Sequence, residues 1–168
     1  LEDKEQIGSM MNNVAIIYWI FDNELDKAIE MFEESYNLTG WIGSLSNIGE
    51  IYNQKGEYEK SLKYYERSLN YRVSVNDKGG IAHMHRLYGQ YYDKIHDYEN
   101  AIKSWKISFD LHSELKYERW KAVSLGGLLG GYHALDQKEN FEKCFFLFLI
   151  VYPVSIILGA TVSLINLL

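Results

Sequence analysis

The residue types that most often carry catalysis or bind metals are sparse in this chain and are not arranged for either task. The five histidines form no His-Glu-x-x-His motif, and His83 and His85 point to different sides of a predicted helix. The run GGLLGG, Gly126 to Gly131, has no strand pattern before it and no Lys-Ser or Lys-Thr pair after it, so it does not predict a phosphate loop. We therefore predict no catalytic residue, no metal and no cofactor, and interpret the glycine run as a place of close helix packing.

Cys144 is the single cysteine, which excludes an internal disulfide and a multi-cysteine zinc site. Two phenylalanines follow it directly. Because apolar surroundings keep a thiol protonated, we expect Cys144 to be buried and unreactive.

Composition places the chain among folded proteins. Its 168 residues are 47% hydrophobic and 15% aromatic and include one proline, which suits one compact domain or one short repeat array. Seventeen basic residues against 23 acidic ones give a net charge of −6, so binding of a nucleic-acid backbone is not expected.

Charge is absent from the C-terminal end of the chain. All charged residues lie within residues 1–143, and residues 144–168 read CFFLFLIVYPVSIILGATVSLINLL. This segment exceeds the ~20 residues that a helix needs to cross a bilayer. Two hypotheses follow for it: a membrane anchor, or an apolar helix that caps the preceding domain. The first residues, LEDKEQIG, carry no secretory signal pattern, so we expect the domain to face the cytoplasm, with a periplasmic or luminal position as the alternative.

Residues 1–143 contain a recurring pattern. A small residue, two spacers and an aromatic residue are followed, about a dozen residues later, by a small residue, three spacers and a bulky aromatic residue. The first half of the pattern occurs at Ala15–Tyr18, Gly49–Tyr52, Gly89–Tyr92 and, weakly, Gly130–His133. The second half occurs at Ala28–Phe32, Ser61–Tyr65, Ala101–Trp105 and Cys144–Phe148.

The pattern resembles the tetratricopeptide repeat, a pair of antiparallel helices. The segment NIGEIYNQKGEYEKSLKYYERSL, Asn47 to Leu69, fits it best, and residues 87–109 fit it without a gap. Ser61 and Ala101 are 40 positions apart rather than 34, which resembles the longer-period repeats of kinesin light chains and signalling adaptors. We place the additional residues around residues 75–82.

The resemblance implies an all-α fold, a right-handed α-solenoid of stacked helix pairs ending in an apolar C-terminal helix. We expect four copies, at about 5–37, 42–75, 80–115 and, degenerate, 117–152. Gly79 or Gly80 should provide the left-handed cap after the second copy, as Gly40 should after the first. Tyr58 and Tyr98 should be buried at equivalent positions. The predicted helices cover residues 5–21, 25–37, 42–54, 58–75, 80–95, 98–115, 117–135 and 141–152, with a last one after Pro153.

In such arrays the first helix of each pair lines a concave groove. In this register the groove positions are rich in amides, which donate and accept hydrogen bonds together and suit an extended peptide, and include one arginine able to grip a carboxylate. The predicted peptide-binding residues are Asn12, Asn13, Asn47, Glu50, Asn53, Gln54, Arg86, Gln90, Asp93 and Lys94. The competing interpretation is an ordinary solvated helix face.

These observations predict a non-enzymatic scaffold that binds a protein or peptide segment in the groove. The alternative is a sensory or regulatory module of a larger membrane-bound signalling protein, such as a sensor kinase, with an enzyme as the weakest hypothesis.

Overall fold

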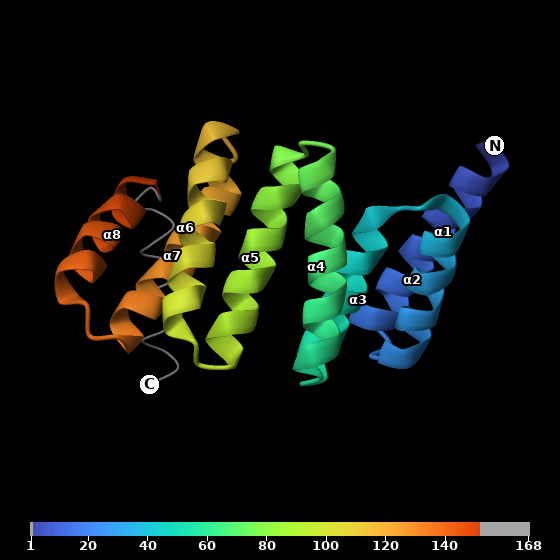
Figure 1. The fold of residues 1–168 in the computed structure, drawn as a ribbon, viewed down its shortest axis with the longest axis horizontal. Helices are drawn as coiled ribbons and strands as arrows, with labels where there is room; N and C mark the ends of the chain where they lie inside the picture. The colour runs from blue at the N-terminus through green and yellow to red at the C-terminus, as the bar shows by residue number, and fades with distance from the viewer. Residues whose placement is uncertain (1, 152–168) are drawn as a thin grey trace. The chain divides into compact units, whose positions relative to one another are not determined.

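The computed structural model describes residues 2–151, and this part of the chain is entirely helical outside its turns, with no strand (Figure 1). The predicted all-α class is thus confirmed. Consecutive helices pack as pairs, which is the arrangement of a helical repeat protein. In chain order the helices are α1 (Glu2–Ile20), α2 (Leu25–Thr39), α3 (Ile42–Gln54), α4 (Tyr58–Ser74), α5 (Lys78–Lys94), α6 (Tyr98–Glu114), α7 (Glu118–Ala134) and α8 (Lys138–Val151).

The chain divides into two compact units, Leu1–Leu87 and Tyr88–Leu168, and each has its own hydrophobic core. In unit 1, small residues of α1 and α2 allow Phe32 to pack against α3. In unit 2, Trp105 is the largest core side chain and packs with Leu125, Leu128 and Tyr132 of α7 and with Cys144 of α8. Cys144 is 7% exposed, and burial raises the pKa of its thiol, so the predicted buried cysteine is confirmed.

The turns from α3 onward recur every 20 residues. Each contains one residue with a left-handed backbone, and the amide of the next residue donates to a carbonyl five positions earlier, as in a Schellman cap. The left-handed residues are Gly56, Asn76, His96, Lys116 and Asp136. The longer period therefore comes from helices α4 to α7, of 17 residues each, and not from an enlarged loop around residues 75–82.

This periodicity corrects one predicted cap. Asn76 has the left-handed conformation (φ 53°), whereas Gly79 and Gly80 lie inside the first turn of α5. Asn tolerates this conformation better than most residues because its short side chain bonds locally. Gly40, with φ 71°, caps α2 as predicted, and its amide donates to the Tyr36 carbonyl.

Aromatic rings pack against glycines where helices of a pair cross. A Cβ atom on Gly49 would lie 2.5 Å from the Tyr65 ring, and one on Gly89 would lie 2.5 Å from the Trp105 ring. Tyr65 is fully buried and Trp105 is 3% exposed. Tyr58 and Tyr98, predicted to be buried, are only half-buried, because the core aromatic of each second helix stands seven residues later.

The non-glycine caps provide a stability prediction. Lys116 has φ 58°, a conformation that costs an L-residue roughly 1–2 kcal/mol. Lys116→Gly should therefore raise the free energy of unfolding by about 0.5–1 kcal/mol, after the larger backbone entropy of glycine in the unfolded chain is counted. Urea denaturation followed by circular dichroism measures the change. The control, Lys106→Gly in the middle of α6, should lower the free energy by about 1 kcal/mol; destabilisation by both variants would contradict the prediction.

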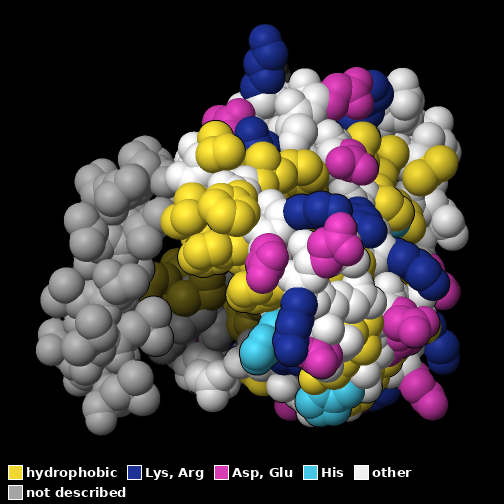
Figure 2. Space-filling view, turned by 90° about the vertical axis from the view of Figure 1, so that its left-hand side faces the viewer, with side chains coloured by type: hydrophobic (Ala, Val, Ile, Leu, Met, Phe, Trp, Pro, Cys, Tyr) yellow, Lys and Arg dark blue, Asp and Glu magenta, His cyan; other side chains and the backbone are white. Residues whose placement is uncertain are grey.

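The apolar end of the chain is described only as far as Val151. On the side of the molecule shown in Figure 2, hydrophobic side chains gather among charged ones, and α8 exposes Phe145, Phe146, Leu147 and Ile150. Among helices α1 to α8 none combines the length and apolarity needed to cross a bilayer. The predicted anchor or capping helix after Pro153 lies outside the described residues.

Candidate functional site

Seven of the ten predicted groove residues belong to unit 1, on the first helices of its pairs. Asn13 and Gln54 are exposed, whereas Asn12, Asn47 and Glu50 are half-buried. The other two, Asn53 and Arg86, are 5% and 8% exposed. The predicted positions thus include accessible amides together with two side chains that the fold has largely withdrawn from solvent.

Arg86 lies in the electrostatic field of this chain's own groups. Burial lowers the pKa of its guanidinium, while Glu50 and Tyr65 act in the opposite direction. The pKa of Tyr65 is raised, first by burial and then by the negative charge of Glu50. The negative charge of Glu50 therefore already stabilises the positive charge of Arg86 within unit 1. An incoming carboxylate would compete with Glu50 for this interaction.

Gln54 connects two first helices of unit 1. Its Oε1 accepts a hydrogen bond of 2.8 Å from Trp19 Nε1, so α1 and α3 are held together at their C-terminal ends. This bond uses the Gln54 amide oxygen, while the side chain as a whole is exposed. Asn13 and Asn47 lie earlier on the same two helices.

The remaining three residues, Gln90, Asp93 and Lys94, lie on the part of α5 that belongs to unit 2. Gln90 is half-buried and Lys94 is exposed. Asp93 accepts a 2.9 Å hydrogen bond from Trp105 Nε1; burial raises the pKa of its carboxyl, and this bond opposes the rise. Asp93 therefore has a structural task in positioning the core tryptophan.

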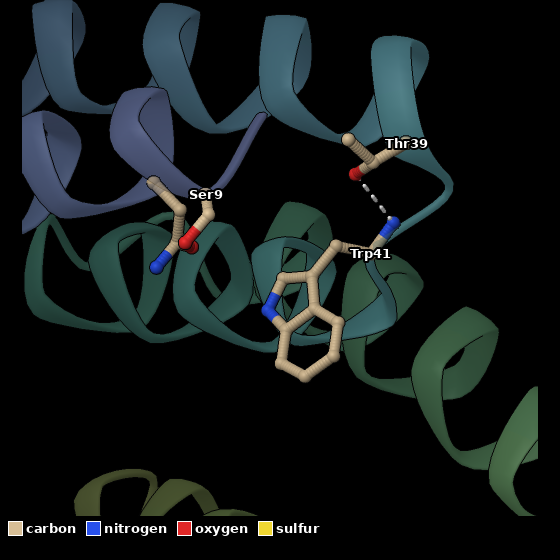
Figure 3. Close-up of a pocket in the computed structure, with 4 residues that line it drawn as sticks. Ser9, Thr39 and Trp41 are labelled. Carbon is tan, nitrogen blue, oxygen red and sulfur yellow. Dashed lines mark hydrogen bonds between the residues drawn. The ribbon is translucent and has the colours of Figure 1, made fainter. Parts of the chain in front are cut away.

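A pocket of about 420 Å³ adjoins the N-terminal half of the predicted groove, and Ser9, Asn12, Thr39 and Trp41 line it. Figure 3 shows Ser9 on α1 and the indole of Trp41, just before α3, facing the same space, with Thr39 at the end of α2. We call it the Trp41 pocket. Of its four described lining residues, only Asn12 belongs to the predicted peptide-binding set.

Hydrogen bonds fix the rim of the Trp41 pocket. Thr39 Oγ1 donates to the Ser35 carbonyl at 2.8 Å. It also accepts from the Trp41 amide at 3.1 Å, the bond that Figure 3 shows as a dashed line. Ser35 Oγ in turn donates to the Gly8 carbonyl at 2.8 Å, which ties α2 to α1. The pocket is therefore built from three helices that are bonded to one another.

Two glycines make room for the lining side chains. A Cβ on Gly8 would clash with the Thr39 methyl group, and one on Gly43 would lie 2.5 Å from Trp41 Nε1. The indole thus rests on the backbone of α3 with 59% of its surface exposed. The sequence does contain a signal for this site. Trp41 directly follows the Thr39-Gly40 helix end, so it lies in a connection between helices, where no helix face buries its ring.

One polar atom of the residues that line the Trp41 pocket lacks a hydrogen-bond partner in the described part of the chain. Asn12 Oδ1 is buried and accepts no hydrogen bond from any described residue. An unsatisfied buried acceptor costs about 1–3 kcal/mol. A half-turn about χ2, which is broad for asparagine, would exchange this oxygen with the amide nitrogen, and a ligand donor that reached the oxygen would remove the cost.

Two of the four glycines in the run Gly126 to Gly131 have the predicted role in close helix packing. A Cβ on Gly127 would clash with the Trp105 ring, and one on Gly131 would lie 2.6 Å from Ile102. Gly126 and Gly130 have open space beside them. Within residues 2–151 no three His, Cys, Asp or Glu side chains are grouped to hold a metal ion.

Comparison with known proteins defines the class to which this arrangement belongs. Residues 42–106 match the family model described as tetratricopeptide repeat. The fold is also similar to the crystal structure of BtubC (BKLC) from P. vanneervenii, with a TM-score of 0.79 and 15% sequence identity. The similarity covers 88% of this chain and 64% of that one, and no curated protein matches the chain.

The protein is therefore a helical repeat protein of stacked helix pairs. Residues 42–106, which run from α3 into α6, match the tetratricopeptide-repeat model, in agreement with the resemblance that the sequence pattern indicated. Repeats of this family generally mediate contacts between proteins.

Proposed function

We propose that the protein is a non-enzymatic scaffold that binds an extended segment of another protein along the first helices of unit 1. The observation that carries the proposal is the row of amides that folding leaves accessible or half-buried on α1 and α3, namely Asn12, Asn13 and Asn47. Asparagine is a weak helix former, and its use here in place of a better one suits recognition, because each amide offers both a donor and an acceptor to a peptide backbone.

The other groove residues of unit 1 support this row in different ways. Gln54 keeps α1 and α3 in register through Trp19, and Glu50 and Arg86 set the charge beside the amides. Gln90, Asp93 and Lys94, on the part of α5 that belongs to unit 2, complete the predicted set of groove residues. The members of the predicted set with exposed side chains are Asn13, Gln54 and Lys94.

A cytoplasmic location and a membrane anchor in residues 144–168 are part of the same proposal. The anchor rests on the charge-free sequence of this segment alone.

Selection from a displayed library of random dodecapeptides against the full chain tests the binding function. We expect enriched peptides to bind, in fluorescence anisotropy, at least about 10-fold more weakly to Asn13→Ala/Asn47→Ala, because each lost amide removes a donor and an acceptor. Asn70→Ala, an exposed amide on α4, is the matched control and should bind unchanged.

Equal affinity for the double variant and the wild type would remove the amide row from the binding site. Failure of every library to enrich a peptide would contradict the scaffold function itself.

A further inference from the structure

We infer that the Trp41 pocket receives a basic side chain, with arginine preferred over lysine, from the protein segment that the scaffold binds. The inference rests on the proposed function, because it assigns part of the partner's chemistry to one end of the same face. It adds a specific subsite whose ligand is defined by charge, shape and donor groups.

Charge is the first argument. Residues 1–41, which contain α1, α2 and Trp41, hold nine acidic residues and two basic ones, a net charge of −7 in a chain whose total is −6. The rest of the chain is therefore close to neutral. An acidic helix pair concentrates cations at its surface and repels acidic segments.

The exposed indole is the second argument. A guanidinium or ammonium group over an indole face gains cation–π attraction, which is strongest for tryptophan, and the planar guanidinium also stacks on the ring. Other accessible rings of this protein already carry a cation from the chain itself, such as Lys27 over Tyr18 and Arg119 over Trp120. No described basic residue covers Trp41, which leaves that indole face for a ligand.

The polar lining is the third argument. The groups that face the pocket are the Asn12 amide and the Ser9 and Thr39 hydroxyls, and no described lining residue is basic. The unsatisfied atom is an acceptor, the buried Asn12 Oδ1, so a ligand group that reaches it must donate. A guanidinium has five N–H donors and no acceptor, whereas a carboxylate has only acceptors and would leave the oxygen unsatisfied.

The preference for arginine over an uncharged donor follows from combining these arguments. A glutamine or a backbone amide could donate to Asn12 Oδ1 but would gain nothing from the acidic helix pair and little from the indole face. The pocket volume of about 420 Å³ accommodates a whole arginine side chain.

Titration of the 168-residue protein with short capped peptides tests the inference. The probes are Ac-Gly-Arg-Gly-amide and the same peptide with citrulline, which keeps the shape of arginine but is uncharged. The readout is the indole N–H signal of Trp41 in a heteronuclear NMR spectrum, assigned with Trp41→Phe. We expect the arginine peptide to shift this signal saturably, with a Kd on the order of 1 mM, and citrulline to bind at least about 5-fold more weakly.

Variants locate the donor contact. Asn12→Ala should weaken arginine binding at least about 3-fold, while Asn70→Ala, an exposed amide on α4 that is not among the described lining residues, should leave it unchanged. The signals of Trp19, Trp105 and Trp120 report whether each variant is folded.

Two results would overturn the inference: equal affinity for arginine and citrulline, or no shift of the Trp41 signal at tens of millimolar peptide. Neither would affect the scaffold proposal, since library-selected peptides could still lose affinity in Asn13→Ala/Asn47→Ala. Conversely, saturable arginine binding without any selected peptide would leave the subsite and remove the scaffold.

Discussion

Replacing Trp105 by alanine should lower the free energy of unfolding by about 3–5 kcal/mol. Its ring is 3% exposed and forms the centre of the unit 2 core, so truncation leaves a large cavity that helices on both sides cannot close. The change also removes the donor from Asp93, whose carboxylate is partly desolvated. Urea denaturation monitored by circular dichroism gives the value.

Two further tryptophan variants separate packing from hydrogen bonding. Trp105→Phe retains most of the ring volume and loses the N–H donor, and we expect it to cost about 1–2 kcal/mol. Trp41→Ala removes a ring that is 59% exposed and should change stability by no more than about 0.5 kcal/mol. A cost below about 1 kcal/mol for Trp105→Ala would show that this ring is not the core of unit 2.

The sequence predicts the helices well because two kinds of signal coincide in it. The bounds of α3, 42–54, are as expected, since its apolar spacing is followed by the Lys55-Gly56 stop. In the structure the small residue of the first half of the pattern meets the large aromatic residue of the second half, Gly49 against Tyr65 and Gly89 against Trp105. A small residue is required wherever a large ring crosses the partner helix, so this pattern reports a tertiary contact.

The cap after α4 was predicted wrongly because glycine is only one solution to a left-handed turn. Asn76, His96, Lys116 and Asp136 occupy equivalent positions, and a lysine or histidine there gives no local signal. Only the strict 20-residue spacing of the turns identifies them. Propensity alone therefore favoured Gly79 and Gly80, which the structure places inside α5.

The candidate site shows where sequence reasoning ends. The predicted positions do lie on the first helices. The register could not reveal that Trp19 donates a hydrogen bond to Gln54, that Trp105 donates one to Asp93, or that the charge of Glu50 acts on Arg86. Each of these pairs joins different helices. The Trp41 pocket was missed for the same reason, since it depends on the packing of α1, α2 and α3 around two glycines.

The second large effect is a difference in sign between neighbouring glycines of α7. Gly127→Ala should lower the free energy of unfolding by about 1–3 kcal/mol, because the new methyl group meets the ring of Trp105, which the core holds in place. Gly126→Ala adds the same methyl group in open space and should raise the free energy by up to about 1 kcal/mol through helix propensity. Parallel urea denaturations compare the two.

A double-mutant cycle shows whether the clash with Trp105 causes the difference. In a Trp105→Phe background the smaller ring vacates space beside α7, so Gly127→Ala should cost at least about 1 kcal/mol less than in the wild type, while Gly126→Ala should keep its value. An unchanged cost of Gly127→Ala would place the strain elsewhere in α7. Stabilisation by Gly127→Ala in the wild type would mean that the ring moves freely, which a central core residue does not do.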